Sequence, residues 1–112
     1  MQYSIQIYET RDGRNPFDEW MEDLADVQGK QKIRTRLNRL ALGLLGDCDP
    51  VGQGVHELKI DFGPGYRVYF GMISKNIVLI LSVNSKKRQQ KDIDRAKEYF
   101  EDYKKRKNYG IK

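Results

Sequence analysis

Basic side chains are the residues of this chain best suited to chemistry, and two of them lie in one predicted β-hairpin. Lys59 and Arg67 flank the turn Gly63-Pro64-Gly65. Glycine and proline are typical of tight turns between strands. If a three-residue loop joins Phe62 to Tyr66, then Lys59 and Arg67 are diagonal neighbours, with backbones roughly 7–8 Å apart. We therefore expect both cations to reach a single phosphate group.

Two different faces are predicted for this hairpin, because side chains alternate across a strand. Even-numbered positions are apolar or aromatic: Leu58, Ile60, Phe62, Tyr66, Val68 and Phe70. Odd-numbered positions are charged or hydroxylated: Glu57, Lys59, Asp61, Arg67 and Tyr69. We expect the even face in the core and the odd face against water or a ligand. The same register places Asp61 opposite Arg67 and Lys59 opposite Tyr69.

A second basic segment, Lys86-Lys87-Arg88, follows the last predicted strand. RNA cleavage requires activation of a 2′-hydroxyl, stabilisation of a phosphorane and protonation of the leaving 5′-oxygen. Arginine binds phosphate oxygens through two parallel hydrogen bonds. A lysine surrounded by other cations has a lowered pKa and can transfer protons near neutral pH. Preorganised positive charge of this kind favours phosphate chemistry that needs no metal.

The composition limits the alternatives. A chain of 112 residues is long enough for one domain with its own core, and we assign residues 1–112 to a single domain. With 21 Lys and Arg against 16 Asp and Glu, the net charge of +5 favours an anionic partner. One cysteine and one histidine argue against a disulfide and a His/Cys metal site, so we expect no cofactor. No apolar run predicts a signal peptide or membrane span, which indicates a cytoplasmic protein without membrane contact.

Hydrophobic periodicity predicts seven elements in the order β-α-α-β-β-β-α. They are a strand at 3–8, helices at about 16–26 and 28–42, strands at 55–62, 66–73 and 77–83, and a helix at about 89–107. The segment 46–54 is expected as a loop. Gly29 is expected at a loose junction between the first two helices, and Trp20 is expected in the core.

These elements predict an α+β fold. The last three strands form an antiparallel meander, and the first strand joins at one side to give an antiparallel-rich four-stranded sheet. A helical hairpin covers one face, and a helix ends the chain. The outer face of the second helix is basic, through Arg34, Arg36 and Arg39, and is a candidate surface for RNA phosphates.

Three stretches of this sequence resemble the RelE/ParE toxin superfamily. The first is the hairpin, with Glu57-Leu58-Lys59-Ile60 followed by Gly63-Pro64-Gly65-Tyr66-Arg67-Val68-Tyr69-Phe70. The others are the region 36–55 and the segment 90–99, so that the resemblance covers nearly the whole chain. It is strongest to addiction-module killer proteins of the HigB-like, phage-derived branch.

This resemblance implies a type II toxin, a metal-independent mRNA endonuclease that cuts in the ribosomal A site and inhibits translation. It implies three partners: a cognate antitoxin with a DNA-binding helix-turn-helix, the ribosome and mRNA. Lys59 and Arg67 match basic residues of the family, and Lys86 and Arg88 occupy the place of its later basic residues. We therefore expect Lys59, Arg67 and Lys86 to be catalytic.

The residues that we expect to bind RNA are Arg88, Lys87, Tyr69, Arg34, Arg36 and Arg39. The tyrosine with which some family members stack on a base falls near Asp92 here, so Tyr69 and Tyr99 are the candidates for that role. Two other functions remain open. One is inhibition of DNA gyrase, as in ParE-like toxins, and the other is a catalytically inactive, toxin-like binding protein.

Overall fold

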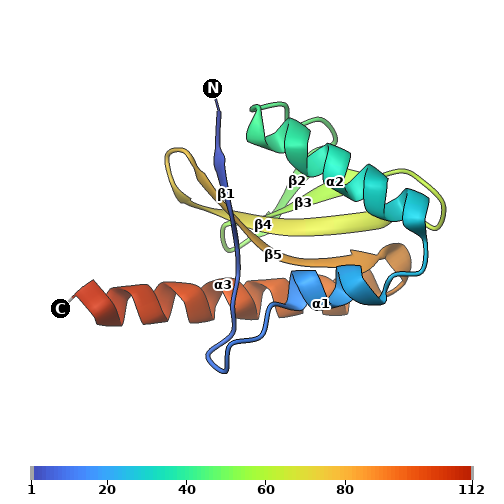
Figure 1. The fold of residues 1–112 in the computed structure, drawn as a ribbon. Coiled ribbons are helices and arrows are strands. Elements are labelled where there is room, and N and C mark those ends of the chain that lie inside the picture. Colours follow the sequence, from blue (N-terminus) through green and yellow to red (C-terminus); the bar gives the residue numbers. More distant parts are fainter. Residues whose placement is uncertain (1, 112) are drawn as a thin grey trace.

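A five-stranded sheet lies between helices on its two faces in the computed structural model, which describes residues 2–111 (Figure 1). The elements follow in the order β1 Ser4–Ile7, α1 Pro16–Asp23, α2 Val27–Ala41, β2 Cys48–Gly52, β3 Val55–Ile60, β4 Tyr66–Ser74, β5 Ile77–Ser85, a 3₁₀ turn Lys86–Arg88, and α3 Gln89–Ile111. The predicted α+β class is therefore correct. No helix in residues 2–111 is long and apolar enough to cross a membrane.

The sheet has the order β1-β5-β4-β3-β2 and is mixed, because β1 pairs with β5 in parallel and the other pairs are antiparallel. The predicted four-stranded sheet is wrong, since β2 lies in the segment expected as a loop. Pro50 and Gly52 suggested a loop. Both are accommodated because β2 is an edge strand that pairs only with β3, and its register shifts between these two residues.

The register of the central hairpin also differs from the prediction. Ile60 pairs with Tyr66, so the loop is 61–65 and Lys59 lies directly opposite Arg67. The turn closes through a hydrogen bond of 2.9 Å from Gly65 N to Phe62 O, and Gly63 and Gly65 have positive φ angles of 58° and 86°. The pairing moved by two residues, which keeps every side chain on its predicted face.

One face of the sheet is covered by α1 and α2. Phe17 and Met21 of α1 and Ile33 and Leu40 of α2 form a core with the even-numbered side chains of β3 and β4. This core continues onto β5 through Val78, Ile80 and Val83. This packing covers one face of β3 and β4, and the opposite face of the sheet is covered by α3.

Gly29 is buried inside α2, so the prediction of a loose junction was wrong. The Asp26 side chain caps α2 by accepting a hydrogen bond of 2.9 Å from Gly29 N, and it accepts a second one from the Tyr66 hydroxyl at 2.5 Å. A Cβ at Gly29 would lie 2.5 Å from Asp26 Oδ2 and 2.8 Å from the Tyr66 hydroxyl oxygen. Glycine is needed here for this close approach, which ties α2 to the start of β4.

The other face is covered by α3, whose Ile93, Ala96 and Phe100 form a second core. Figure 1 shows α2 and α3 on opposite sides of the sheet. The expectation that the whole odd-numbered face meets water or ligand was therefore wrong: Glu57 and Tyr69 are only 2% and 0% exposed. Strand periodicity could not show this, because the position of a distant helix is a tertiary property.

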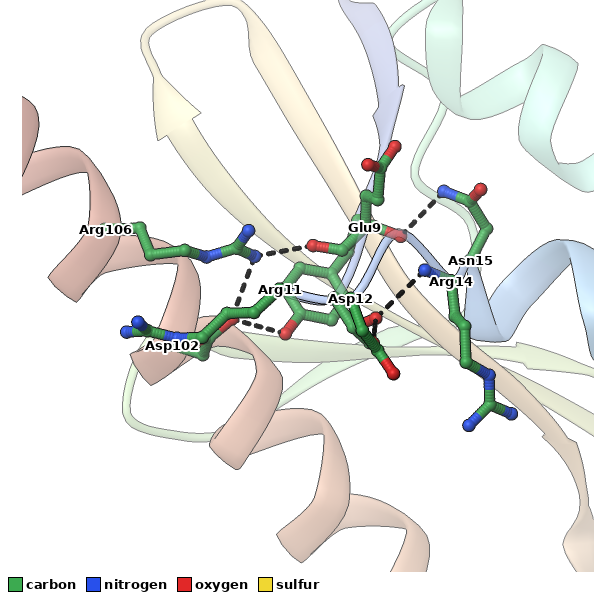
Figure 2. A network of polar contacts seen from close by, with 9 residues as sticks. Glu9, Arg11, Asp12, Arg14, Asn15, Asp102 and Arg106 are labelled. Atoms are coloured by element: carbon green, nitrogen blue, oxygen red, sulfur yellow. Dashed lines mark hydrogen bonds and ion pairs between the residues drawn. The ribbon is translucent and has the colours of Figure 1, made fainter.

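The middle of α3 is attached to the loop after β1 by a polar network (Figure 2). Asp102 accepts a hydrogen bond of 2.6 Å from the Tyr8 hydroxyl and forms ion pairs with Arg11 at 2.7 Å and Arg106 at 2.8 Å. Arg106 also donates to Glu9 O. Burial raises the pKa of Asp102, but the bonds from Tyr8 and Arg11 and the charge of Arg106 outweigh it, so that this pKa is lowered.

Candidate functional site

Lys59, Arg67 and Asn84 form one polar row across β3, β4 and β5. Lys59 pairs with Arg67, and Arg67 pairs with Asn84. Side chains at paired positions of neighbouring strands lie on the same face. The adjacent row, which contains Glu57 and Tyr69, is buried under the start of α3, whereas Lys59 and Arg67 are only partly buried.

The three residues predicted to be catalytic line a single pocket. Lys59, Arg67 and Lys86 surround a volume of about 210 Å³ together with Asp47, Ile60, Asp61 and Gly65, and we call it the cation pocket. Lys86 is held beside the hairpin by a hydrogen bond of 3.0 Å from its backbone N to Gly65 O. The structure thus brings Lys86 of the later basic segment next to the hairpin. The catalytic role of Lys59, Arg67 and Lys86 stays a prediction.

Lys59 is fixed in its charged form. Its Nζ lies 2.6 Å from Asp49 Oδ2 on the neighbouring strand β2, and 29% of its side chain is exposed. The hydrogen bond to Asp49 raises the pKa of Lys59. The general rule that neighbouring cations lower the pKa of a lysine does not hold for Lys59, because a carboxylate on β2 is its partner.

Arg67 has an unused hydrogen-bond donor. Its Nε is buried and has no hydrogen-bond partner within residues 2–111. Leaving a buried donor unpaired costs roughly 1–3 kcal/mol. The Arg67 side chain lines the cation pocket, and arginine binds phosphate through charge-assisted hydrogen bonds, so its guanidinium is a candidate phosphate ligand there.

Tyr69 cannot contact RNA as predicted, because its side chain is fully buried. Its hydroxyl donates a hydrogen bond of 3.2 Å to Glu57 Oε2, which also accepts one of 2.8 Å from the Gln89 side chain. Burial and the charge of Glu57 raise the pKa of Tyr69. Glu57 therefore links Tyr69 to Gln89, the first residue of α3. Tyr99, the other candidate for base stacking, stacks on Tyr8 with ring centroids 4.9 Å apart.

The arginines on α2 have different environments. The Arg36 guanidinium donates hydrogen bonds to Leu45 O and Asp47 O, at 3.0 and 3.1 Å, so it holds the chain that leads into β2. Arg36 and Arg39 line a pocket of about 350 Å³ that shares Asp47, Lys59 and Asp61 with the cation pocket. Arg39 and Arg34 are exposed, and Arg39 lines this pocket together with Lys59.

Lys87 and Arg88 line a different cavity from Lys86. This tryptophan pocket has a volume of about 310 Å³ and is formed by Trp20, Asn84, Ser85, Lys87, Arg88 and Asp92. Trp20 packs edge-on against Tyr66, with centroids 5.9 Å apart, yet it is only partly buried. Burial raises the pKa of Asp92, and the charges of Arg88 and Arg95 oppose this shift.

Asp47, Asp49 and Asn84 are site residues that sequence reasoning missed. The pair between Asp49 and Lys59 depends on β2, which was expected as a loop. The position of Asn84 beside Arg67 depends on the register of β4 and β5. The sequence could have indicated Asn84 only if the strand predicted at 77–83 had been extended to include it. Among residues 2–111, no three His, Cys, Asp or Glu side chains cluster as a metal site would require.

Comparison with known proteins finds a relative of this chain in Haemophilus influenzae. The chain is 42% identical over 81 residues to a Haemophilus influenzae protein described as "Uncharacterized protein". The aligned region covers 72% of this chain and 82% of that relative. No family model matches the chain.

Proposed function

The chain belongs to the same family as this Haemophilus influenzae protein, and we propose that it is the toxin of a type II toxin–antitoxin system. Its activity is metal-independent, ribosome-dependent endonucleolytic cleavage of mRNA, which inhibits translation. One observation carries this proposal: Lys59, Arg67 and Lys86, from three separate segments, line the cation pocket. The resemblance to RelE/ParE toxins, in its HigB-like branch, supports the same activity.

The pocket is suited to a phosphate whose negative charge grows during reaction. The fixed ammonium of Lys59 and the guanidinium of Arg67 lie at directly paired strand positions. Positive groups that are already in place stabilise a phosphorane without reorganising during the reaction. The guanidinium of Arg67, which lines the pocket, supplies charge-assisted hydrogen bonds for its oxygens.

The environments of the two lysines suggest different roles. Lys59 has a raised pKa and stays protonated at neutral pH, which suits it to protonate the leaving 5′-oxygen. Lys86 forms no ion pair with any residue that the structure describes, and we assign its neutral amine form, which has a free lone pair, to accept the proton of the 2′-hydroxyl. Arg67 binds the scissile phosphate, and Arg88, in the tryptophan pocket, binds a flanking one.

The proposed partners are the ribosome, mRNA and a cognate helix-turn-helix antitoxin. Contact with ribosomal RNA requires neutralisation of phosphates over an area wider than one pocket. The exposed Arg34 and Arg39 of α2 supply such charge, and Arg39 lies beside the cation pocket.

The test is expression of the Lys59→Ala/Arg67→Ala double variant in bacteria, with growth and primer extension on cellular mRNA as readouts. The wild type should stop growth and produce codon-phased cuts, and the variant should do neither while keeping a folded circular-dichroism spectrum. The matched control is Lys75→Ala/Arg95→Ala, which removes the same charges at exposed positions outside the pocket. It should remain toxic.

Three results would contradict the proposal. Full toxicity of the double variant would refute the assignment of Lys59 and Arg67 to the catalytic site. DNA damage without mRNA cuts would favour a gyrase inhibitor, and wild-type expression without a growth defect would favour an inactive binding protein.

A further inference from the structure

The tryptophan pocket has the chemistry of a nucleobase site. It combines one aromatic side chain, Trp20, with an amide, Asn84, a carboxyl group, Asp92, and the cations Lys87 and Arg88. Its volume of about 310 Å³ is within the range of small-molecule sites. We propose that this pocket binds the base of a nucleotide next to the scissile phosphate, with guanine preferred, an inference that rests on the function proposed above.

The pocket is adjacent to the cation pocket. Asn84 lines the tryptophan pocket, and its paired residue Arg67 lines the cation pocket. Paired residues of antiparallel strands have Cα atoms roughly 5 Å apart. Lys86 and Lys87, which are consecutive, line the cation pocket and the tryptophan pocket respectively. A nucleotide whose phosphate lies at Arg67 therefore has a cavity for a neighbouring base within reach.

Trp20 is available for stacking. It is the single tryptophan of the chain and is held by α1 with its ring edge-on to Tyr66. It is only partly buried, because the rest of the side chain lines the pocket. Proteins that bind single-stranded RNA commonly stack unpaired bases on aromatic side chains. The indole thus provides a flat stacking surface on the side of the sheet that α1 and α2 cover.

The polar groups of the pocket favour guanine. An ionised Asp92 only accepts hydrogen bonds, and guanine presents two neighbouring donors, N1–H and the N2 amino group. The Asn84 amide can donate to the guanine carbonyl oxygen or accept from the base. Uracil offers one ring N–H between two carbonyl oxygens, which a carboxylate repels. Lys87 and Arg88 are exposed at the rim, where they can bind the flanking phosphates.

The experiment uses the intrinsic fluorescence of the full-length protein, since Trp20 is its only tryptophan. GMP and UMP are titrated separately, and free tryptophan amide corrects for absorbed light. We expect GMP to quench and saturate the emission and to bind about tenfold more tightly than UMP, the size of one good base contact. Asp92→Asn should weaken GMP binding by about tenfold, also the loss of one base contact.

The matched control is Asp94→Asn, which removes the same charge from an exposed position two residues further along α3 and should bind GMP as the wild type does. Absence of saturable quenching, equal affinity for GMP and UMP, or unchanged binding in Asp92→Asn would overturn the inference. Binding without mRNA cleavage by the wild type would refute only the proposed function, and cleavage without binding would refute only the base site.

Discussion

Lys59 of β3 and Arg67 of β4 lie directly opposite each other, and their side chains lie on the same face of the sheet. Two cations at paired strand positions repel each other, which is destabilising. Asp49 balances Lys59, but Arg67 forms no ion pair with a residue in the described part of the chain. A fold that leaves this cation without an ion-pair partner at a pocket is suited to bind an anion there.

Arg67→Met should therefore abolish mRNA cleavage while stabilising the fold. The substitution keeps an unbranched side chain and removes both the repulsion and the unpaired buried donor. We expect the free energy of unfolding to rise by about 0.5–1 kcal/mol, the size of one cross-strand pair. Urea denaturation of the purified protein measures this change. A loss of stability of more than about 1 kcal/mol would instead give Arg67 a structural role.

Asp49→Asn should lower the pKa of Lys59, because the carboxylate that raises it is removed. If Lys59 is the proton donor, the high-pH limb of the cleavage profile moves to lower pH. The pKa can be measured by NMR of the lysine side chain, and cleavage by single-turnover assays across the same pH range. The control Asp94→Asn should leave both unchanged. An unshifted limb together with a lowered lysine pKa would exclude Lys59 as the donor.

The ion pair between Lys59 and Asp49 also makes the stability of the fold depend on pH in a defined direction. The folded-state pKa of Lys59 is raised, so its contribution to stability is fully present below the unfolded-state pKa and is lost as the pH rises through the folded-state value. The stability advantage of the wild type over Asp49→Asn should therefore be lost only in alkaline solution. Urea midpoints at neutral and alkaline pH measure this difference.

Gly29→Ala should destabilise the protein, although alanine is normally the better helix former. Its Cβ would displace the Asp26 carboxylate and the Tyr66 hydroxyl, which hydrogen-bond each other. The loss of the cap and of this bond should cost about 1–3 kcal/mol. Thermal denaturation measures it against Thr35→Ala, a change at an exposed position of the same helix. A Gly29→Ala variant that is as stable as wild type would show that Asp26 and Tyr66 move apart without cost.

Asp102→Ala should loosen α3. It removes the acceptor of the Tyr8 hydroxyl and both ion pairs, and the buried hydroxyl should cost about 1–3 kcal/mol when unpaired. Amide exchange in α3 should accelerate more than in α2. Glu101→Ala is the control, because its contact with Lys104 is exposed and 3.7 Å long. Equal exchange in both variants would contradict this role.

The network also has a pH dependence. The folded-state pKa of Asp102 is lowered, so its contribution to stability is present above the unfolded-state pKa and is lost as the pH falls through the folded-state value. The difference in stability between wild type and Asp102→Ala should shrink in acid, which urea midpoints at neutral and acidic pH can check.

Sequence periodicity alone determined the strands around the hairpin, the three helices and the shared face of Lys59 and Arg67. These features are local, since alternation and helical spacing act over a few residues. The basic residues after the last strand were also evident. Most of the candidate site residues could therefore be named from the sequence, as could the α+β class.

Tertiary structure alone decided which of these residues meet. The hairpin register placed Arg67 opposite Lys59, and β2 brought Asp49 to the lysine. Docking of α3 buried Tyr69, which the alternation had placed on the open face. Each outcome depends on contacts between segments far apart in the chain, whose free energies combine only when the sheet and helices pack together. For the same reason, the cavity between Trp20 and Asp92 was invisible in the sequence.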